Sequence, residues 1–230
     1  MINENMIDVN PFVLDLIKQG ILKTPEIIDA FKHINRADFV PPESKEEAYI
    51  DTPLSIGEGQ TISQPLTVAF MIELLQPEAG NKIFEIGFGS GWQTAILAEI
   101  VGKSGKIFAV ERIPELYRFG RKNIAKYNFI KKGIVKTIGG DATLGLKRHA
   151  PFDKIIAAAS AREIPEAWLK ELCPSGTSPA GRKIGGRLVA PVKESIWLYI
   201  KKSDLPASRQ ENNFEKYEYP GFVFVPLVNG

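Results

Sequence analysis

The feature that most constrains the fold is the stretch Lys82-Ile-Phe-Glu-Ile-Gly-Phe-Gly-Ser-Gly-Trp92. Its first half is an apolar run that Glu85 interrupts, and three glycines then follow at alternate positions, Gly87, Gly89 and Gly91. Apolar residues recur with the helical period from there to Val101. The pattern predicts a strand, a tight glycine turn and a helix. Such a turn lets the backbone approach a ligand closely, and the helix start offers free N–H groups to it.

Acidic residues stand at the ends of two further predicted strands. Residues 105–110 form an apolar run, and Glu111 follows it 20 residues after Gly91. At that spacing, nucleotide-binding folds place the carboxylate that meets the ribose hydroxyls. Strand 133–138 leads into Asp141, which can accept a hydrogen bond from an adenine amino group, although Asp is also a common loop residue.

The order of the glycines separates two kinds of nucleotide ligand. A dinucleotide fingerprint reads Gly-x-Gly-x-x-Gly, whereas here Trp92 fills the place of its third glycine. A large ring at that position argues against a pyrophosphate on the helix start, and therefore against a nicotinamide dehydrogenase. The turn suits a ligand without phosphates, of which S-adenosylmethionine is the common example. Trp92 itself is expected either beside this ligand pocket or in the core.

Helices and strands alternate along most of the chain. Helices are expected over 11–20, 24–34, 65–75, 92–101, 114–127 and 165–172, and strands over 82–86, 105–110, 133–138, 152–159, 186–191, 195–201 and 222–227. No helix separates the last three strands clearly, which favours an antiparallel edge. The prediction is an α/β Rossmann-like fold with a mostly parallel seven-stranded sheet, an antiparallel edge strand, helices on both faces and an N-terminal helical arm.

Length and composition are ordinary for one globular unit. At 230 residues, with 44% hydrophobic and 24% charged residues, the chain is expected to form a single domain. Residues 1–65 would supply the helical arm and a substrate loop, and 66–230 the cofactor-binding core. The net charge of +2, with both signs scattered, gives no reason to expect nucleic acid or a membrane as a partner.

Cysteine content and hydropathy bear on disulfides, metal sites and cellular location. Cys173 is the only cysteine, so an intramolecular disulfide and a cysteine zinc site are excluded, and no metal site is expected. No segment has the 18 or so apolar residues of a membrane span, and the N-terminus lacks an apolar signal core. We therefore expect a cytoplasmic, monomeric protein.

The second informative stretch is 48–65, which combines two glycines with hydroxyl-bearing residues between apolar anchors. Ser63 comes just before the predicted helix that Pro65 opens. It can cap the free N–H groups of that helix, as many serines do at this position, or it can bind a ligand. The local sequence leaves both roles open.

These residues resemble the protein-L-isoaspartate O-methyltransferase family. The matching pieces run through most of the chain and are Asp38-Phe-Val40, Ala48-Tyr49, Pro53-Leu54, Ile56-Gly57, Gly59-Gln-Thr-Ile-Ser-Gln-Pro65, Glu85-Ile-Gly-Phe-Gly-Ser-Gly-Trp-Gln-Thr-Ala95, Val110-Glu-Arg-Ile113, Gly140-Asp141, Pro151-Phe-Asp153, Ile164-Pro165, Gly185-Gly-Arg-Leu-Val-Ala-Pro-Val192 and Phe224-Val-Pro-Leu227. The block 59–65 is the specific one, because very many methyltransferases share the glycine turn.

The resemblance implies a methyl transfer from S-adenosylmethionine to L-isoaspartyl carboxylates in damaged polypeptides, which begins their repair. The family's active-site serine falls on Ser63, and the substrate is expected at Thr61, Ile62, Ser63 and Gln64. The cofactor is expected at Glu85, Ile86, Gly87, Gly89, Ser90, Gly91, Glu111, Arg112, Asp141 and Ala142.

The chain departs from the family pattern in three places. Ser55 stands where a proline is usual, the segment 174–185 is longer than the family's, and little chain follows the predicted last strand to cover the adenosine or the substrate. The longer segment is either a harmless surface loop or a change in substrate access. An alternative prediction is therefore a cofactor-binding member of the family with lost or altered acceptor activity.

A nucleic-acid amino methyltransferase is the nearest rival from another class. Such enzymes usually carry Asn/Asp-Pro-Pro-Tyr after the fourth strand, where this chain has Ala157-Ala-Ala-Ser160. The missing motif and the weak net charge both argue against that activity.

Overall fold

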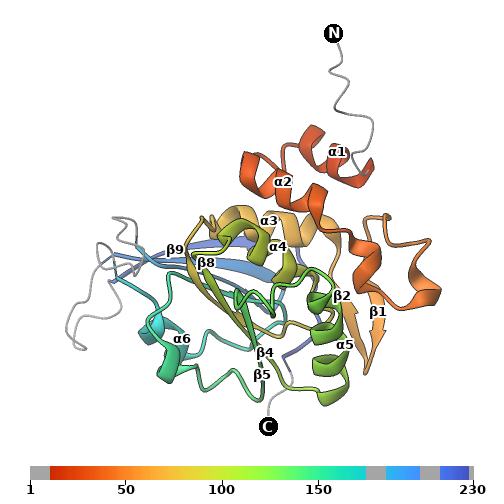
Figure 1. The fold of residues 1–230 in the computed structure, drawn as a ribbon. Coiled ribbons are helices and arrows are strands. Elements are labelled where there is room, and N and C mark those ends of the chain that lie inside the picture. The colour runs from red at the N-terminus through yellow and green to blue at the C-terminus, as the bar shows by residue number, and fades with distance from the viewer. Residues whose placement is uncertain (1–10, 175–184, 203–212, 228–230) are drawn as a thin grey trace.

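The structure, a computed structural model, describes residues 11–174, 185–202 and 213–227. Its centre is a seven-stranded sheet with the order β5-β4-β3-β6-β7-β8-β9 (Figure 1). The strands are β3 (Lys82–Ile86), β4 (Lys106–Glu111), β5 (Val135–Gly139), β6 (Lys154–Ala157), β7 (Arg187–Val192), β8 (Ser195–Lys201) and β9 (Phe214–Pro220). Of the longer segment expected at 174–185, residues 175–184 fall outside the described residues.

Direction and order of the strands fix where a ligand can bind. Strands β3 to β7 pair in parallel, and β8 pairs antiparallel with both β7 and β9. The mostly parallel sheet with an antiparallel edge is thus confirmed. The chain builds outward from β3 through β4 to β5 and then crosses to β6 on the other side of β3. Ligands of open α/β sheets bind at the carboxyl ends of the strands beside such a reversal.

Helices cover both faces of the sheet, as expected. On one face lie α3 (Pro65–Leu75), α4 (Trp92–Val101) and α5 (Pro114–Ala125), packed on alternate strand residues that include Ile83, Ile107 and Val189. The opposite face carries Phe84, Phe108 and Leu188, and there α6 (Glu166–Glu171) covers it with Trp168. The period of two along each strand therefore divides its apolar residues between two cores.

The N-terminal arm consists of α1 (Pro11–Lys18) and α2 (Pro25–His33), which lie on α3 and α4 (Figure 1). Trp92 joins the arm to α4: its ring centroid lies 5.6 Å from that of Phe31 and 6.4 Å from that of Phe12, both edge-on. The Trp92 side chain is 1% exposed. It therefore belongs to the core, and its bulk serves the docking of the arm.

The connector after α2 is more regular than its sequence suggests. Residues 35–42 read as extended, but the chain forms two 3₁₀ turns, η2 (Arg36–Phe39) and η3 (Pro42–Ser44). Residues 54–62, part of the expected substrate loop, form an antiparallel hairpin of β1 (Leu54–Gly57) and β2 (Gln60–Ile62). Its turn has positive φ at three successive residues, Gly57, Glu58 and Gly59, and two of these are glycines, which adopt that conformation without strain.

The predicted last strand at 222–227 is wrong. The last strand is β9, which pairs with β8, and Gly221, at φ +94°, then turns the chain out of the sheet. Pro226 has no N–H to give to a ladder, so 222–227 runs as a single extended segment. Ser160, just beyond β6, binds it on both sides, with its N–H 2.9 Å from Val225 O and its O 2.8 Å from Leu227 N. The segment therefore lies over the carboxyl end of β6.

Candidate active site

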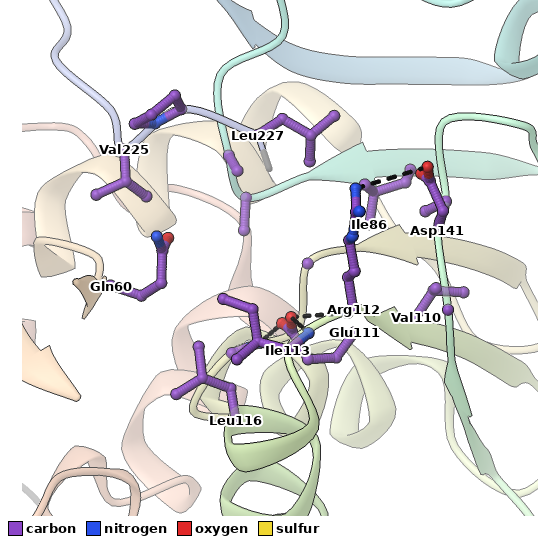
Figure 2. A pocket seen from close by; sticks show the side chains of 17 residues that line it. Gln60, Ile86, Val110, Glu111, Arg112, Ile113, Leu116, Asp141, Val225 and Leu227 are labelled. Carbon is purple, nitrogen blue, oxygen red and sulfur yellow. Dashed lines mark hydrogen bonds and ion pairs between the residues drawn. The ribbon is translucent and has the colours of Figure 1, made fainter. Parts of the chain in front are cut away.

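A cleft opens at the carboxyl ends of β3, β4 and β6 (Figure 2). It is lined by Gln60, Ile86, Gly87, Gly89, Val110, Glu111, Arg112, Ile113, Leu116, Gly140, Asp141, Ala142, Ala158, Ala159, Val225, Pro226 and Leu227. Seven of the ten residues predicted to bind the cofactor are in this set. Glu85, Ser90 and Gly91 are not.

The glycine turn approaches α5 so closely that side chains cannot fit. Gly91 has φ +85°, and a Cβ there would lie 2.9 Å from Gly120 O and 2.7 Å from Ile124 Cγ1. A Cβ at Gly120 would lie 2.2 Å from Gly89 O. By contrast, nothing lies within 4 Å of the Cβ position of Gly87, which faces the cleft. Gly91 and Gly120 thus allow the turn and α5 to pack closely, and Gly87 leaves room for a ligand.

Glu111 holds this turn with its carboxylate. Its Oε2 accepts a hydrogen bond from Gly89 N at 2.9 Å, and its Oε1 accepts from Arg112 N at 2.8 Å and Ile113 N at 2.9 Å. Each carboxylate oxygen can accept about two hydrogen bonds, so Oε2 keeps one acceptor position for a ligand hydroxyl. The negative charge beside Gly89 also opposes a pyrophosphate in this turn.

The charge of the cleft suits a cationic ligand. Two carboxylates, those of Glu111 and Asp141, line it together with one cation, Arg112. Arg112 Nη1 lies 3.8 Å from Asp141 Oδ2, and both side chains are about one-third exposed, so this ion pair is weak (Figure 2). The N–H and the hydroxyl of Thr143 donate to Asp141 Oδ1 and hold the pKa of Asp141 below its ordinary value. The acid is therefore ionised at neutral pH.

Glu85 lies behind the cleft and is completely buried. Burial raises its pKa from 4.5 to about 7, and the nearby charge of Glu111 acts in the same direction. Gln93 Nε2 donates to its Oε1 at 3.1 Å. The hydroxyl of Ser90, another predicted cofactor residue, accepts from Trp92 N at 3.3 Å and thus serves the start of α4.

The cleft has a wall that sequence reasoning missed. Figure 2 shows Gln60 reaching from β2 toward Val225, on the side opposite Glu111. The extended segment 225–227 completes this wall. A signal was available for Gln60, because it lies in the specific block 59–65. None was available for Val225, because its place follows from the unpredicted turn at Gly221.

The hairpin adjoins the glycine turn directly. A Cβ at Gly89 would lie 3.4 Å from Ile56 Cδ1, so β1 packs against the turn. From Gln60 in the cleft wall, β2 leads in three residues to Ser63. The hairpin and the glycine turn, which are distant in sequence, therefore meet at one place.

The structure excludes one of the two roles that the sequence left open for Ser63, the capping of α3. The first free N–H groups of α3 are served by Asp51, whose Oδ1 accepts from Leu66 N at 2.8 Å. The residue at the cap position is Gln64, and its side chain makes no capping bond. Within the described chain, the half-buried Ser63 hydroxyl makes no hydrogen bond. Ser63 is not the helix cap, and its hydroxyl remains available to a ligand.

The other predicted substrate residues are differently placed. Ile62 is 3% exposed, so its side chain belongs to the core. Gln64 Nε2 donates to Asp51 Oδ2 at 3.0 Å, which occupies its amide. Thr61 is half-buried and pairs with Ser55 across the hairpin. Of the four, Ser63 and Thr61 have side chains with a polar group left for a substrate.

Fold and site together define the class of S-adenosylmethionine-dependent methyltransferases with a Rossmann-like sheet. The chain belongs to the family described as Protein-L-isoaspartate(D-aspartate) O-methyltransferase (PCMT), whose family model matches residues 8–230. The protein-L-isoaspartate O-methyltransferase of Methanopyrus kandleri is 38% identical over 213 residues, 91% of this chain and 86% of that protein. The enzyme of the same name from Staphylothermus marinus is 45% identical over 186 residues, 78% and 77% of the two chains.

Solved structures agree on the fold. A Plasmodium falciparum protein, described as a putative protein-L-isoaspartate O-methyltransferase in complex with S-adenosyl-L-homocysteine, superposes with a TM-score of 0.77 and 24% identity. The superposition covers 96% of this chain and 98% of that chain. Among the described residues, no helix has the length and apolar character that a membrane crossing requires.

Proposed function

We propose that the chain transfers the methyl group of S-adenosylmethionine to the free carboxylate of L-isoaspartyl residues in polypeptides. The observation that supports the proposal is that Gln60, three residues before Ser63, lines the cleft, and that Ile56 on the same hairpin packs against Gly89. The relatives that share 37–45% of its sequence carry that activity in their names. The acidic lining of the cleft supports a positively charged donor.

Methyl transfer to a carboxylate asks little proton chemistry of the protein. An aspartyl-type carboxyl has a pKa near 4, so the acceptor is ionised at neutral pH. The donor supplies the methyl group on a positively charged sulfur. What remains for the chain is to hold the acceptor oxygen in line with that methyl group and to keep water out.

On the donor side, the free acceptor position of Glu111 Oε2 would take a ribose hydroxyl, and Asp141 would take the adenine amino group. The space at Gly87 gives the ligand room to lie against the backbone. Glu85, in the second layer, would favour the cationic end of the donor through its charge. A bound cation would in turn lower the pKa of Glu85.

On the acceptor side, Ser63 is the proposed catalytic residue, and its hydroxyl would donate to one oxygen of the carboxylate. The hydroxyl of Thr61 and the backbone of Ile62 would complete the contacts, while Gln64 contributes through its bond to Asp51. These hydrogen bonds must not stabilise the carboxylate strongly, because its charge is lost on methyl transfer and strong bonds would raise the barrier. The proposal includes a monomeric, cytoplasmic enzyme that acts on polypeptides and not on nucleic acid, in line with the net charge of +2.

The test is transfer of a labelled methyl group to an isoaspartyl peptide and to its normal aspartyl twin. We expect label on the first peptide and at most traces on the second; equal labelling, or none, would overturn the proposed substrate. Ser63→Ala should lower the rate about 100-fold while donor binding stays within twofold. The matched control is Ser55→Ala, an exposed serine on the same hairpin, which should keep full activity.

Calorimetry measures donor binding on the same chain that is assayed for methyl transfer. Binding without transfer to any isoaspartyl peptide would identify the chain as a cofactor-binding family member that has lost acceptor activity.

A further inference from the structure

Arg36 is a fully buried cation that does not line the cleft. It begins η2, between the helical arm and the hairpin, and its side chain is 0% exposed. Its guanidinium donates only to backbone carbonyls: Nη1 to Ala48 O at 2.9 Å and Ile50 O at 3.4 Å, and Nη2 to Thr52 O at 2.9 Å and Ser63 O at 3.1 Å. One side chain thus holds four peptide groups of the acceptor region.

These four bonds join two separate segments. Three of the carbonyls belong to the loop 48–52, and the fourth belongs to Ser63 at the end of β2. Asp51, in the same loop, ties the segments a second time through Leu66 N and Gln64 Nε2. The Ser63 peptide therefore lies inside a cross-link between the loop and the start of α3. Since χ1 of a serine starts from its own backbone, fixing that peptide fixes the directions open to its hydroxyl.

Burying a charge for loop closure alone is costly. Desolvation lowers the pKa of Arg36 to about 10, and the negative charge of Asp51 opposes this shift, so the group is charged at neutral pH. A planar fork of donors is the feature that reaches carbonyls on two sides at once. Arg36 Cζ lies over the ring of Trp92, 5.3 Å from the ring centroid, and this cation–π contact stabilises the buried charge.

We infer that Arg36 is a positioning residue for methyl transfer, which orients the Ser63 hydroxyl by holding the Ser63 carbonyl against loop 48–52. The inference rests on the proposed function and adds a residue to its acceptor side. A lysine at this position keeps a positive charge but presents its donors from a single nitrogen. Its three donors are too few for the four carbonyls, so the link between the loop and Ser63 would be weakened.

The test is a double-mutant cycle between Arg36→Lys and Ser63→Ala. In the chain with Ser63, Arg36→Lys should lower kcat/KM for an isoaspartyl peptide about 30-fold, with the donor dissociation constant within twofold. In the Ser63→Ala chain, the same change should cost less than threefold, because its target is already gone. Equal losses in both backgrounds, or a Ser63→Ala chain with full activity, would overturn the inference.

Arg187→Lys is the matched control. Arg187 is half-buried and, like Arg36, donates to a backbone carbonyl, Leu74 O at 2.7 Å, but it lies at the amino end of β7, away from the cleft. We expect a similar loss of thermal stability there and kcat/KM within threefold of the parent chain. A comparable fall in kcat/KM would mean that loss of stability explains both effects, and the inference would fail.

A second readout does not depend on activity. Hydrogen exchange should be about tenfold faster over 48–66 in Arg36→Lys, with 82–92 unchanged. Unchanged exchange over 48–66 overturns the inference even in a chain that methylates nothing. An inactive parent chain would instead remove the proposed function, so the two failures are distinguishable.

Discussion

The cleft and the β1–β2 hairpin, which we propose hold the donor and the acceptor, adjoin each other but are each held in place by different means. The cleft is built from the ends of parallel strands, and its turn is fixed by backbone bonds, such as Gly87 N to Val110 O at 2.9 Å, and by Glu111. The acceptor region is a short hairpin and a loop that two side chains, Arg36 and Asp51, tie to the start of α3. A change at the cleft should therefore disturb the fold and donor binding together. A change at the hairpin should lower the turnover rate and leave the fold and donor binding unaffected.

The strongest way to break the cleft is Gly91→Ala. The new Cβ would need the left-handed conformation and would meet Gly120 O and Ile124, so we expect a loss of about 4 kcal/mol in unfolding free energy and of donor binding. Chemical denaturation and calorimetry measure the two. Gly20→Ala is the control: it has φ +68° but nothing within 4 Å, and should cost about 1 kcal/mol. Equal losses would show that contact with α5 is unimportant.

Glu85→Gln tests the buried charge behind the cleft through the pH dependence of the unfolding free energy. The pKa of Glu85 is about 7 in the folded chain and 4.5 in the unfolded chain, so between these values the folded chain binds the extra proton and its stability falls as the pH rises. Relative to the Glu85→Gln variant, the parent chain should lose roughly 3 kcal/mol in unfolding free energy as the pH is raised from the unfolded pKa to above the folded one.

Denaturant titrations of both chains across this range measure the difference. The difference is needed because Lys154, whose pKa burial lowers to about 7, also titrates there and is common to both chains. A constant difference between the chains would contradict the assigned burial of the charge.

Glu111→Gln tests the carboxylate that serves both the turn and the ligand. An amide has one oxygen to accept with, so it cannot satisfy both Gly89 N and Arg112 N. We expect donor affinity to fall about tenfold, or roughly 1.4 kcal/mol, by calorimetry. Glu115→Gln, an exposed acid in the first turn of α5, should leave affinity unchanged. An unaltered dissociation constant in Glu111→Gln would remove the residue from the site.

Asp51→Asn should have the smallest effect of these substitutions, and it tests how the hairpin region is tied to the start of α3. Asparagine keeps an oxygen for Leu66 N but cannot accept from Gln64 Nε2 as well. Turnover of an isoaspartyl peptide should fall about fivefold, near 1 kcal/mol, while donor affinity stays within twofold. Asp29→Asn, on the exposed side of α2, should change neither quantity. A loss of donor affinity in Asp51→Asn would show that the two regions are not separable.

The same contrast explains how much the sequence could predict. β3, the glycine turn and α4 were predictable because their periods of 2 and 3.6 switch at Gly87, and the spacing to Glu111 then places a second strand end beside the first. The three backbone partners of Glu111 have no such signal. Its place was predicted, and its role in holding the turn was not.

The acceptor side was predicted as a motif and not as a structure. Arg36 binds carbonyls 12 to 27 residues away. Every residue has a backbone carbonyl, so no sequence pattern predicts which ones Arg36 binds. The capping of α3 by Asp51 is equally hidden, because the local rule points to Ser63. The last strand failed for a local reason: Phe222-Val-Phe-Val-Pro-Leu227 has strand composition, but Gly221 and Pro226 take it out of the ladder.

The wall formed by residues 225–227 has a consequence for biosynthesis. Ribosomes make the chain from its N-terminus, so the glycine turn, the hairpin and the acids of the strand ends all emerge before Val225. A nascent chain can complete the sheet as far as β9 while the cleft still lacks the wall formed by residues 225–227. The cleft therefore gains this wall only after residues 225–227 have been made and have paired with Ser160.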